Sequence, residues 1–246
     1  MANPPFNQKG WRAENELVDD PRWRGYVVPP KSNANYGWIL NMVSKLSENG
    51  VAGFILANGA LSGGGEEYKI RRKLIENKVV EAIMVLPQDM FYTTNISVTV
   101  WILNKNKKEQ TRRIGDETRQ YRNREKEILF MDLRQIGEPF EKKFIQFSEQ
   151  HIKAIAATYH TWQKESNNYK NIPEYCYSAT FDEVAKKDFS LVPSKYIEFV
   201  NRDENIDFDK KMQILQTEIS ELLKAEVKSK ADLLTVFKEL GYEIKL

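Results

Sequence analysis

Apolar residues along this chain fall into short runs and helical patterns that predict helices and strands in turn. From about Asn35 they recur every three or four residues, which predicts a helix that Asn49 and Gly50 close. The next run, 51–57, is apolar with little alternation, as expected for a strand covered on both faces. A second helix is expected at 66–77, because its acidic residues come first and its basic residues later.

Three further apolar runs predict strands at 79–86, 97–103 and 128–133. Strands that alternate with helices are typical of an α/β fold. Residues 1–33 are rich in proline and glycine, which excludes a long helix there. The segment 105–127 is polar and reads as a solvated loop between two strands.

Helical patterns dominate the chain after about Phe147. Apolar residues at helical spacing are Ile152, Ile155, Ala156, Tyr159 and Trp162. An amphipathic helical tail follows from Phe208 to Leu240, with a possible point of interruption at 229–232. These changes divide the chain into an α/β part at 1–147, a helical extension at 148–200 and the tail at 201–246.

Composition narrows the class of protein. The 246 residues are 41% hydrophobic, which excludes disorder, and a net charge of +2 gives no support to a polybasic protein. One cysteine, Cys176, excludes an intrachain disulfide, and two histidines, His151 and His160, make a metal site unexpected. The sequence shows no apolar run of ~20 residues and no signal peptide, so we expect a cytoplasmic protein without a membrane span.

The residues Asn3, Pro4, Pro5 and Phe6 suggest chemistry on an amino group. The amide oxygen of Asn3 and the backbone carbonyl of Pro4 can accept both N–H bonds of an exocyclic amine, which turns its lone pair toward an electrophilic methyl group. Two prolines fix the loop, and Phe6 offers a face on which a flipped-out base can stack. A proline turn with a buried phenylalanine is the structural alternative.

Further motifs follow in order along the chain and strengthen the catalytic interpretation. They are Asn3–Asn7, Asp20–Trp23, Asn33–Tyr36, Leu46–Gly50, Gly53–Gly59, Glu67–Arg71, Leu86–Pro87, Phe91–Thr94 and Ile102–Lys105. This series resembles the modification subunit of type I restriction-modification systems, an S-adenosylmethionine-dependent DNA N6-adenine methyltransferase. The resemblance runs from Asn3 to about Lys108 and returns more loosely at 128–133 and 175–196.

The resemblance implies roles for particular residues. Asn3, Pro4, Pro5 and Phe6 would form the adenine clamp and its stacking platform, and the loop that carries Phe91 and Tyr92 would close the far side of the base. One of these two rings is then a second stacking candidate, although both can equally pack beneath the loop.

The family binds its cofactor at a glycine-rich turn upstream of the Asn-Pro-Pro-Phe motif, which here begins at residue 3. The resemblance therefore implies a partial, Rossmann-like methyltransferase sheet that lacks its N-terminal half. We expect no S-adenosylmethionine binding and no activity by this chain alone. The turn Ser62–Gly65 precedes a helix and is a possible replacement, but it stands in the wrong order for the family, and a flexible turn is the simpler interpretation.

Basic residues offer candidate contacts to DNA phosphates. They are Arg71, Arg72 and Lys73, together with Arg112 and Arg113 in the polar segment, where Tyr121 is interleaved. A solvated loop also explains the second group. The buried-thiol interpretation is the default for Cys176, which has no evident base beside it.

The family implies complexes with a specificity subunit and a restriction subunit. The apolar stripe of the tail fits either internal packing or docking on the specificity subunit. The strand at 51–57 would lack its neighbour, so we expect self-association through an exposed sheet edge. Other functions remain open at this point, namely an assembly module without activity, a protein-glutamine methyltransferase and a DNA-binding fragment.

Overall fold

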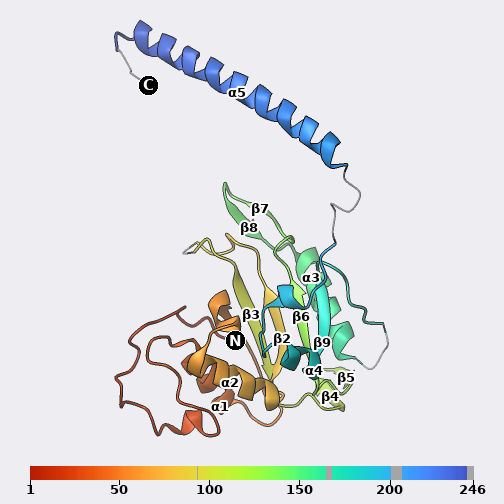
Figure 1. Cartoon of the computed structure of the whole chain (residues 1–246). Helices are drawn as coiled ribbons and strands as arrows, with labels where there is room; N and C mark the ends of the chain where they lie inside the picture. The colour runs from red at the N-terminus through yellow and green to blue at the C-terminus, as the bar shows by residue number, and fades with distance from the viewer. Residues whose placement is uncertain (93, 165–167, 201–206, 243–246) are drawn as a thin grey trace. The chain divides into compact units, whose positions relative to one another are not determined.

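A five-stranded mixed sheet lies at the centre of the first of two units, Met1–Phe199 and Val200–Leu246 (Figure 1). The computed structural model describes residues 1–92, 94–164, 168–200 and 207–242. The sheet has the order β1-β3-β2-β6-β9. Its strands are β1 (Val51–Ala57), β2 (Val80–Val85), β3 (Val98–Asn104), β6 (Glu127–Asp132) and β9 (Cys176–Thr180).

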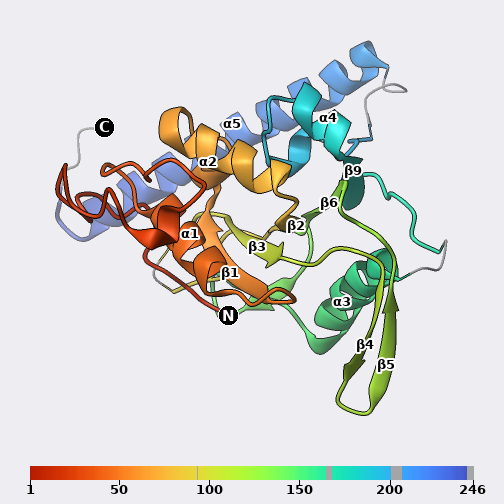
Figure 2. The ribbon, with the colours of Figure 1, turned by 90° about the horizontal axis from the view of Figure 1, so that it is seen from below.

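Helices cover both faces of the sheet, so the first unit has an α/β fold (Figure 2). The helices α1, α2 and α4 lie on one face and α3 lies on the other. Their bounds are Asn35–Lys45 for α1, Gly65–Glu76 for α2, Phe181–Lys186 for α4 and Glu149–Gln163 for α3. Short 3-10 turns at Pro21–Trp23, Asn58–Leu61 and Pro193–Lys195 complete the helical elements of this unit.

Strand direction decides where the loops emerge. Both β1 and β2 pair antiparallel with β3, and β6 pairs parallel with β2, so β1, β2 and β6 point the same way. Their carboxyl ends therefore meet at one edge of the sheet, the usual place for ligand sites in open α/β sheets. We call this the carboxyl edge.

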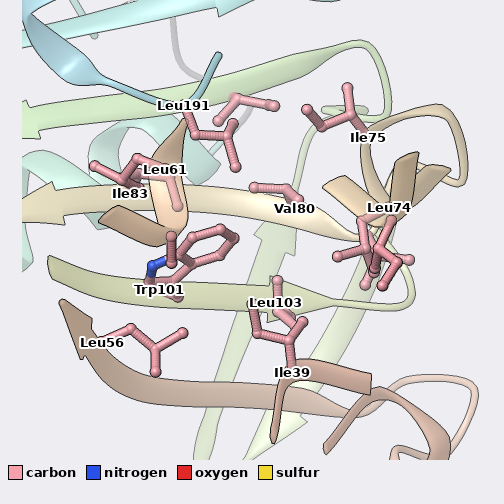
Figure 3. Packing of buried hydrophobic residues seen from close by; sticks show 14 of the residues in the cluster. Ile39, Leu56, Leu61, Leu74, Ile75, Val80, Ile83, Trp101, Leu103 and Leu191 are labelled. Atoms are coloured by element: carbon pink, nitrogen blue, oxygen red, sulfur yellow. The ribbon is translucent and has the colours of Figure 1, made fainter. Parts of the chain in front are cut away.

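The sheet is held between two apolar clusters. Trp101 of β3 is fully buried in the first, where it stacks on Phe54 with ring centroids 6.0 Å apart and meets the edge of Tyr36. Figure 3 shows Ile39 of α1 and Leu74 of α2 in the same cluster. The second cluster lies beneath α3 and includes the buried Trp162.

The expected α/β fold and the four expected strands are confirmed, with ends that differ by at most one residue. The first helix stops at Lys45 rather than near Gly50, because the chain turns to extended conformation at Leu46. The residues before 34 contain one short 3-10 turn and no longer helix.

Two sequence predictions were wrong. The polar segment is not a plain loop, since it holds a hairpin of β4 (Gln110–Ile114) and β5 (Glu117–Tyr121). The extension at 148–200 is not wholly helical, because β9 pairs antiparallel with β6 and completes the sheet. A further hairpin joins β7 (Glu138–Phe140) and β8 (Phe144–Gln146).

The second unit consists of α5 (Phe208–Glu239), which runs without interruption through 229–232, where a break was considered. Residues 201–206, at the start of the predicted tail, lie outside the described part of the chain. No described helix is both long and apolar enough to cross a bilayer.

Opposite the carboxyl edge, a buried charged network joins the sheet to α3. Arg124 donates from Nε to Glu81 Oε1 at 3.3 Å, and both side chains are buried. Gln163 donates to the same carboxylate oxygen at 2.8 Å. Nearby, Lys107 Nζ donates to the carbonyl oxygens of Val80 (2.7 Å) and residue 127 (2.6 Å). Burial lowers the pKa of Lys107 to about 7.

Lys107 should make folding stability depend on pH. Between about pH 7 and about pH 10 the folded chain binds fewer protons at this amine than the unfolded chain does, so stability rises with pH. A neutral amine keeps two N–H bonds for its two carbonyl partners. Measured by urea unfolding, the free energy of unfolding should rise by at most about 1.4 kcal/mol per pH unit in this range. Lys107→Met should remove this rise. The exposed neighbour provides the control Lys108→Met, and equal pH profiles for all three proteins would contradict the prediction.

Candidate functional site

The segment Asn3–Phe6 leaves the sheet at the carboxyl edge. Ala2 pairs in parallel with Phe54 of β1, donating to the carbonyl of Gly53 (3.0 Å) and accepting from the N–H of Ile55 (3.3 Å). The chain therefore points the same way as β1 when it reaches Asn3. The side chain of Asn3 is exposed, as the proposed amide clamp requires.

The far end of this segment is tied to α1. The N–H of Asn7 donates to Asn35 Oδ1 at 3.0 Å, and Asn35 Nδ2 donates back to Asn7 Oδ1 at 2.9 Å. Asn33 donates to the same Asn7 oxygen at 3.2 Å. Asn7 has a φ of 51°, a conformation that asparagine tolerates better than most residues. Four residues are thus held between two anchors, and the sequence motif did not reveal the second.

Phe6 and Phe91 pack against the same apolar cluster. Each ring is half-buried. The cluster beneath them includes Met84, which lies in β2, and Leu86, which follows that strand directly. The two loops that the sequence paired as the walls of a base site thus each place a ring on this cluster. Pro4 is also half-buried, whereas Pro5 is exposed.

Tyr92 has a different environment from Phe91. It is 71% exposed, and its ring meets Phe144 of β8 edge-on with centroids 4.7 Å apart. Of the two candidate stackers, Phe91 belongs to the cluster and Tyr92 stands at the surface. Thr93 of the same motif lies outside the described residues.

The side chain of Glu67 occupies the turn Ser62–Gly65. A Cβ on Gly63 would come within 1.8 Å of Glu67 Oε2, so this carboxylate lies directly against the turn. Burial raises the pKa of Glu67, and within the described structure its Oε1 is buried without a hydrogen-bond partner. When ionised, Glu67 would repel a phosphate, which is the ligand that a glycine-rich turn before a helix ordinarily binds.

Arg71 is a structural residue, so the DNA-binding prediction does not extend to it. Its side chain is buried at 3% exposure, and its guanidinium donates to the carbonyls of Phe189 (2.8 Å) and Gly63 (2.7 Å). Arg72 and Lys73 are exposed on α2 and pair with Glu76 at 2.8 and 3.9 Å.

Arg112 and Arg113 lie away from Asn3–Phe6. They belong to β4, which follows the end of β3 and therefore extends from the edge opposite the carboxyl edge. Arg112 is partly occupied, because its Nε donates to Gln110 Oε1 at 2.8 Å, whereas Arg113 is exposed. The structure does not bring these two arginines to the candidate base site.

The remaining reactive residues have structural partners. His151 belongs to the capping box of α3 with Ser148, and His160 contacts the amide of Gln163 at 3.1 Å. Cys176 is buried, and burial raises the pKa of its thiol. Among the described residues, no group of three or more His, Cys, Asp or Glu is arranged to hold a metal ion.

One charged pair at the carboxyl edge was not predicted. Asp132 ends β6 and is buried, and Arg134 lies two residues further on with its guanidinium against that carboxylate. An aspartate at the end of an otherwise apolar strand was the available signal.

Comparison with known proteins places these features in a family. Residues 1–205 match the model of the N-6 DNA methylase family. The chain is 37% identical over 245 residues to the type I restriction enzyme HindI methylase subunit of Haemophilus influenzae, covering 99% of this chain and 51% of that protein. It is 32% identical to the MjaIX methylase subunit of Methanocaldococcus jannaschii, covering 98% of this chain and 42% of that protein.

A solved structure agrees with these matches. The type I restriction-modification methyltransferase subunit of Streptococcus thermophilus superposes with a TM-score of 0.67 and 26% identity, covering 80% of this chain and 37% of that one. The resemblance read from the sequence is confirmed. The chain spans about half the length of the curated relatives it matches.

Calorimetric titration with S-adenosylmethionine tests the assignment of the Ser62–Gly65 turn. Because Glu67 fills this turn, we expect no detectable heat at ~1 mM ligand, which corresponds to roughly 4 kcal/mol of binding free energy. Stoichiometric binding that is lost in Gly63→Val and retained in the distant variant Lys224→Ala would contradict this prediction and make the turn a cofactor site.

Proposed function

We propose a function from one established premise: the chain belongs to the N-6 DNA methylase family. In this proposal it carries the adenine-binding part of a type I modification subunit, whose whole activity is methyl transfer to adenine N6 in DNA. The sheet would then be the corresponding part of a Rossmann-like methyltransferase fold. S-adenosylmethionine would supply the methyl group in the whole subunit.

Asn3 and Pro4 would hold the amino group of the target adenine. One N–H of N6 would donate to Asn3 Oδ1 and the other to the carbonyl oxygen of Pro4. With both N–H bonds held in this way, the nitrogen lone pair is drawn out of conjugation with the ring and becomes a better nucleophile. Pro4 and Pro5 restrict the backbone, so the two oxygens keep one arrangement.

Phe6 and Phe91 would bind the ring of the base. A base that has left the duplex loses its stacking, and an aromatic face restores part of that free energy. Tyr92 remains a second candidate at the exposed end of the same loop. The observation that carries this proposal is that Phe6 and Phe91 pack against one apolar cluster and belong to segments that both leave the sheet at its carboxyl edge.

The amino clamp makes a sharp prediction about substituted adenine. A short single-stranded oligonucleotide with one adenine should bind roughly tenfold more tightly than the same strand with N6,N6-dimethyladenine, which has no N–H to donate. Asn3→Ala should remove most of this preference. Phe6→Ala should weaken both strands alike, because it removes stacking worth about 1 to 3 kcal/mol.

Gln8→Ala provides the matched control for the clamp, since Gln8 is an exposed amide just beyond the motif. It should keep the preference for adenine. Equal affinity of the unsubstituted protein for the two strands would contradict the proposed clamp. Fluorescence anisotropy of an end-labelled strand supplies the affinities.

The outermost strand of the sheet, β1, supports a proposal about association. Ala2 pairs with the middle of β1, and Val51 at the start of that edge strand is 50% exposed. An edge with unpaired backbone groups recruits a further strand. We therefore expect sedimentation at roughly 10 to 50 micromolar to show association through β1.

A pair of variants locates this association. Val51→Lys should reduce it, because a charge on an edge strand opposes strand pairing. Leu222→Lys on α5, which is also exposed, should leave it unchanged. A strictly monomeric protein, or association lost only in the α5 variant, would refute pairing through β1.

The helix α5 supports a proposal about assembly. None of its residues is buried, although Ile219, Leu222 and Val227 are large and apolar with exposures of 56% to 69%. Such a stripe has the spacing of a helix that packs against another helix. We propose that it docks on helices of a specificity subunit, in a complex that also contains a restriction subunit.

A further inference from the structure

A cavity of about 550 Å³ opens at the carboxyl edge, beside the proposed base site. Three segments line it: the loop after β2, the residues after β6 and the β7–β8 hairpin. The lining residues include Asp89, Arg134, Ile136, Gly137, Lys143 and Ile145. Two of these are cations and one is a carboxylate, so the cavity suits an anionic ligand.

The cavity and the base site share one apolar support. Ile136, which lines the cavity, packs against the same cluster as Phe6 and Phe91. Pro87, Gln88 and Asp89 of the cavity precede Phe91 in the chain, so one short segment joins the two sites. A ligand that occupies both would carry an anionic group beside a flat ring, as a nucleic acid strand does with its phosphates on either side of a base.

Arg134 is fixed in position by Asp132. The guanidinium donates from Nε (2.9 Å) and Nη2 (2.5 Å) to the two carboxylate oxygens, and the backbone N–H of Arg134 donates to Oδ1 at 3.1 Å. The carboxylate side chain is 5% exposed and the arginine side chain 44% exposed, so the pair presents its positive end to solvent. Within the described structure Nη1 makes no hydrogen bond and is free to donate.

Arg134 also borders a second, smaller cavity of about 350 Å³, whose other lining residues include Asn58, Ser62 and Ser194. The arginine therefore stands between two hollows at the ends of β1, β2 and β6. An anchored guanidinium of this kind suits phosphate oxygens, because little side-chain freedom is lost when it binds.

Lys143 is coupled to the loop of the base site. Its Nζ lies 5.0 Å from the centre of the Phe144 ring, which in turn meets Tyr92. The N–H of Ile145 donates to the carbonyl of Asp89 at 3.1 Å, so the hairpin is bonded to the same loop. Cations held beside aromatic rings are typical of surfaces that bind single-stranded nucleic acid.

The hairpin approaches closely because residue 137 is glycine. Gly137 has a φ of 127°, and a Cβ at this position would lie 2.5 Å from Ile145 Cγ2. A larger residue would push β8 away and open the cavity. The absence of a side chain at residue 137 thus allows β8, and Lys143 beside it, to lie close to the cavity.

We propose that Arg134 and Lys143 bind phosphates of the nucleic acid strand that flank the adenine received by Asn3–Phe6. This inference rests on the proposed function, since it extends that site from the base to its backbone. The two cations would position the strand and contribute no base preference, because phosphates carry no sequence information.

Salt dependence tests this proposal. Affinity of the full chain for the single-stranded adenine oligonucleotide is measured over a range of salt concentrations. Each phosphate contact contributes about 0.7 to the slope of log K against log salt for a single strand. Arg134→Gln and Lys143→Gln should each lower the slope by about that amount. Lys142→Gln should leave it unchanged, since Lys142 is exposed on the same hairpin but does not line the cavity.

Two readouts separate this inference from the proposed function. The adenine preference over N6,N6-dimethyladenine reports the base site, and the salt slope reports the phosphates. Slopes that fall in the Arg134 and Lys143 variants while the adenine preference is absent would support the phosphate contacts and refute the clamp. Slopes that are the same in all variants, or no binding by the unsubstituted chain at low salt, would overturn the phosphate proposal.

Arg134→Gln leaves Asp132 buried without its ion-pair partner and can destabilise the fold. Lys143→Gln avoids this problem, because Lys143 is exposed and has no ion-pair partner in the described structure. Arg134→Lys keeps the charge but loses the two-point contact with Asp132 and should give an intermediate affinity. An unchanged slope in Lys143→Gln is sufficient to exclude its phosphate contact.

Discussion

The backbone pairing of Ala2 with β1 is the constraint on which the candidate site depends. Two hydrogen bonds join the first residues to the sheet and set the direction in which Asn3–Phe6 leaves it. The side chains of Asn7 and Asn35 then hold the other end. Between these anchors the segment is not part of a β-strand. Its short length and its two prolines therefore define where the amide oxygen of Asn3 and the carbonyl oxygen of Pro4 lie.

The direction of the strands explains why the functional candidates gather at one edge. Because β1, β2 and β6 run parallel, the segments that follow them emerge together with Asn3–Phe6. The opposite edge has a structural role, since Glu81, Arg124 and Lys107 join the sheet to its neighbours there. The proposed base and phosphate sites would both lie at the carboxyl edge. At the opposite end of the strands, the buried charged network holds the sheet against α3.

Much of the fold was predictable because burial leaves a pattern in apolar residues. The runs at 51–57, 79–86, 97–103 and 128–133 became strands. The strand β9 could not be predicted in this way, because its sequence CYSAT is short and mixed, and pairing with β6 defines it. The β4–β5 hairpin was missed for a related reason: its polar strands are stabilised mainly by each other.

The candidate site was predictable where a motif carried the chemistry, and less so where partners lie far away in sequence. Asn3–Phe6 and Phe91 were proposed from their residues alone. Arg71 appeared to be a surface cation, but its carbonyl partner Phe189 is 118 residues away. Charge order suggested a regular start for α2, yet only the packed structure shows that Glu67 fills the turn before it.

Photochemical crosslinking tests the central claim most directly. A single-stranded oligonucleotide that carries one 8-azidoadenine is irradiated with the full chain, and the modified peptides are identified by mass spectrometry. The account predicts crosslinks in Asn3–Phe6 or at Phe91 and Tyr92, and their loss when an adenine oligonucleotide competes. Crosslinks confined to residues 105–126 or to α5 would contradict an adenine site at the carboxyl edge.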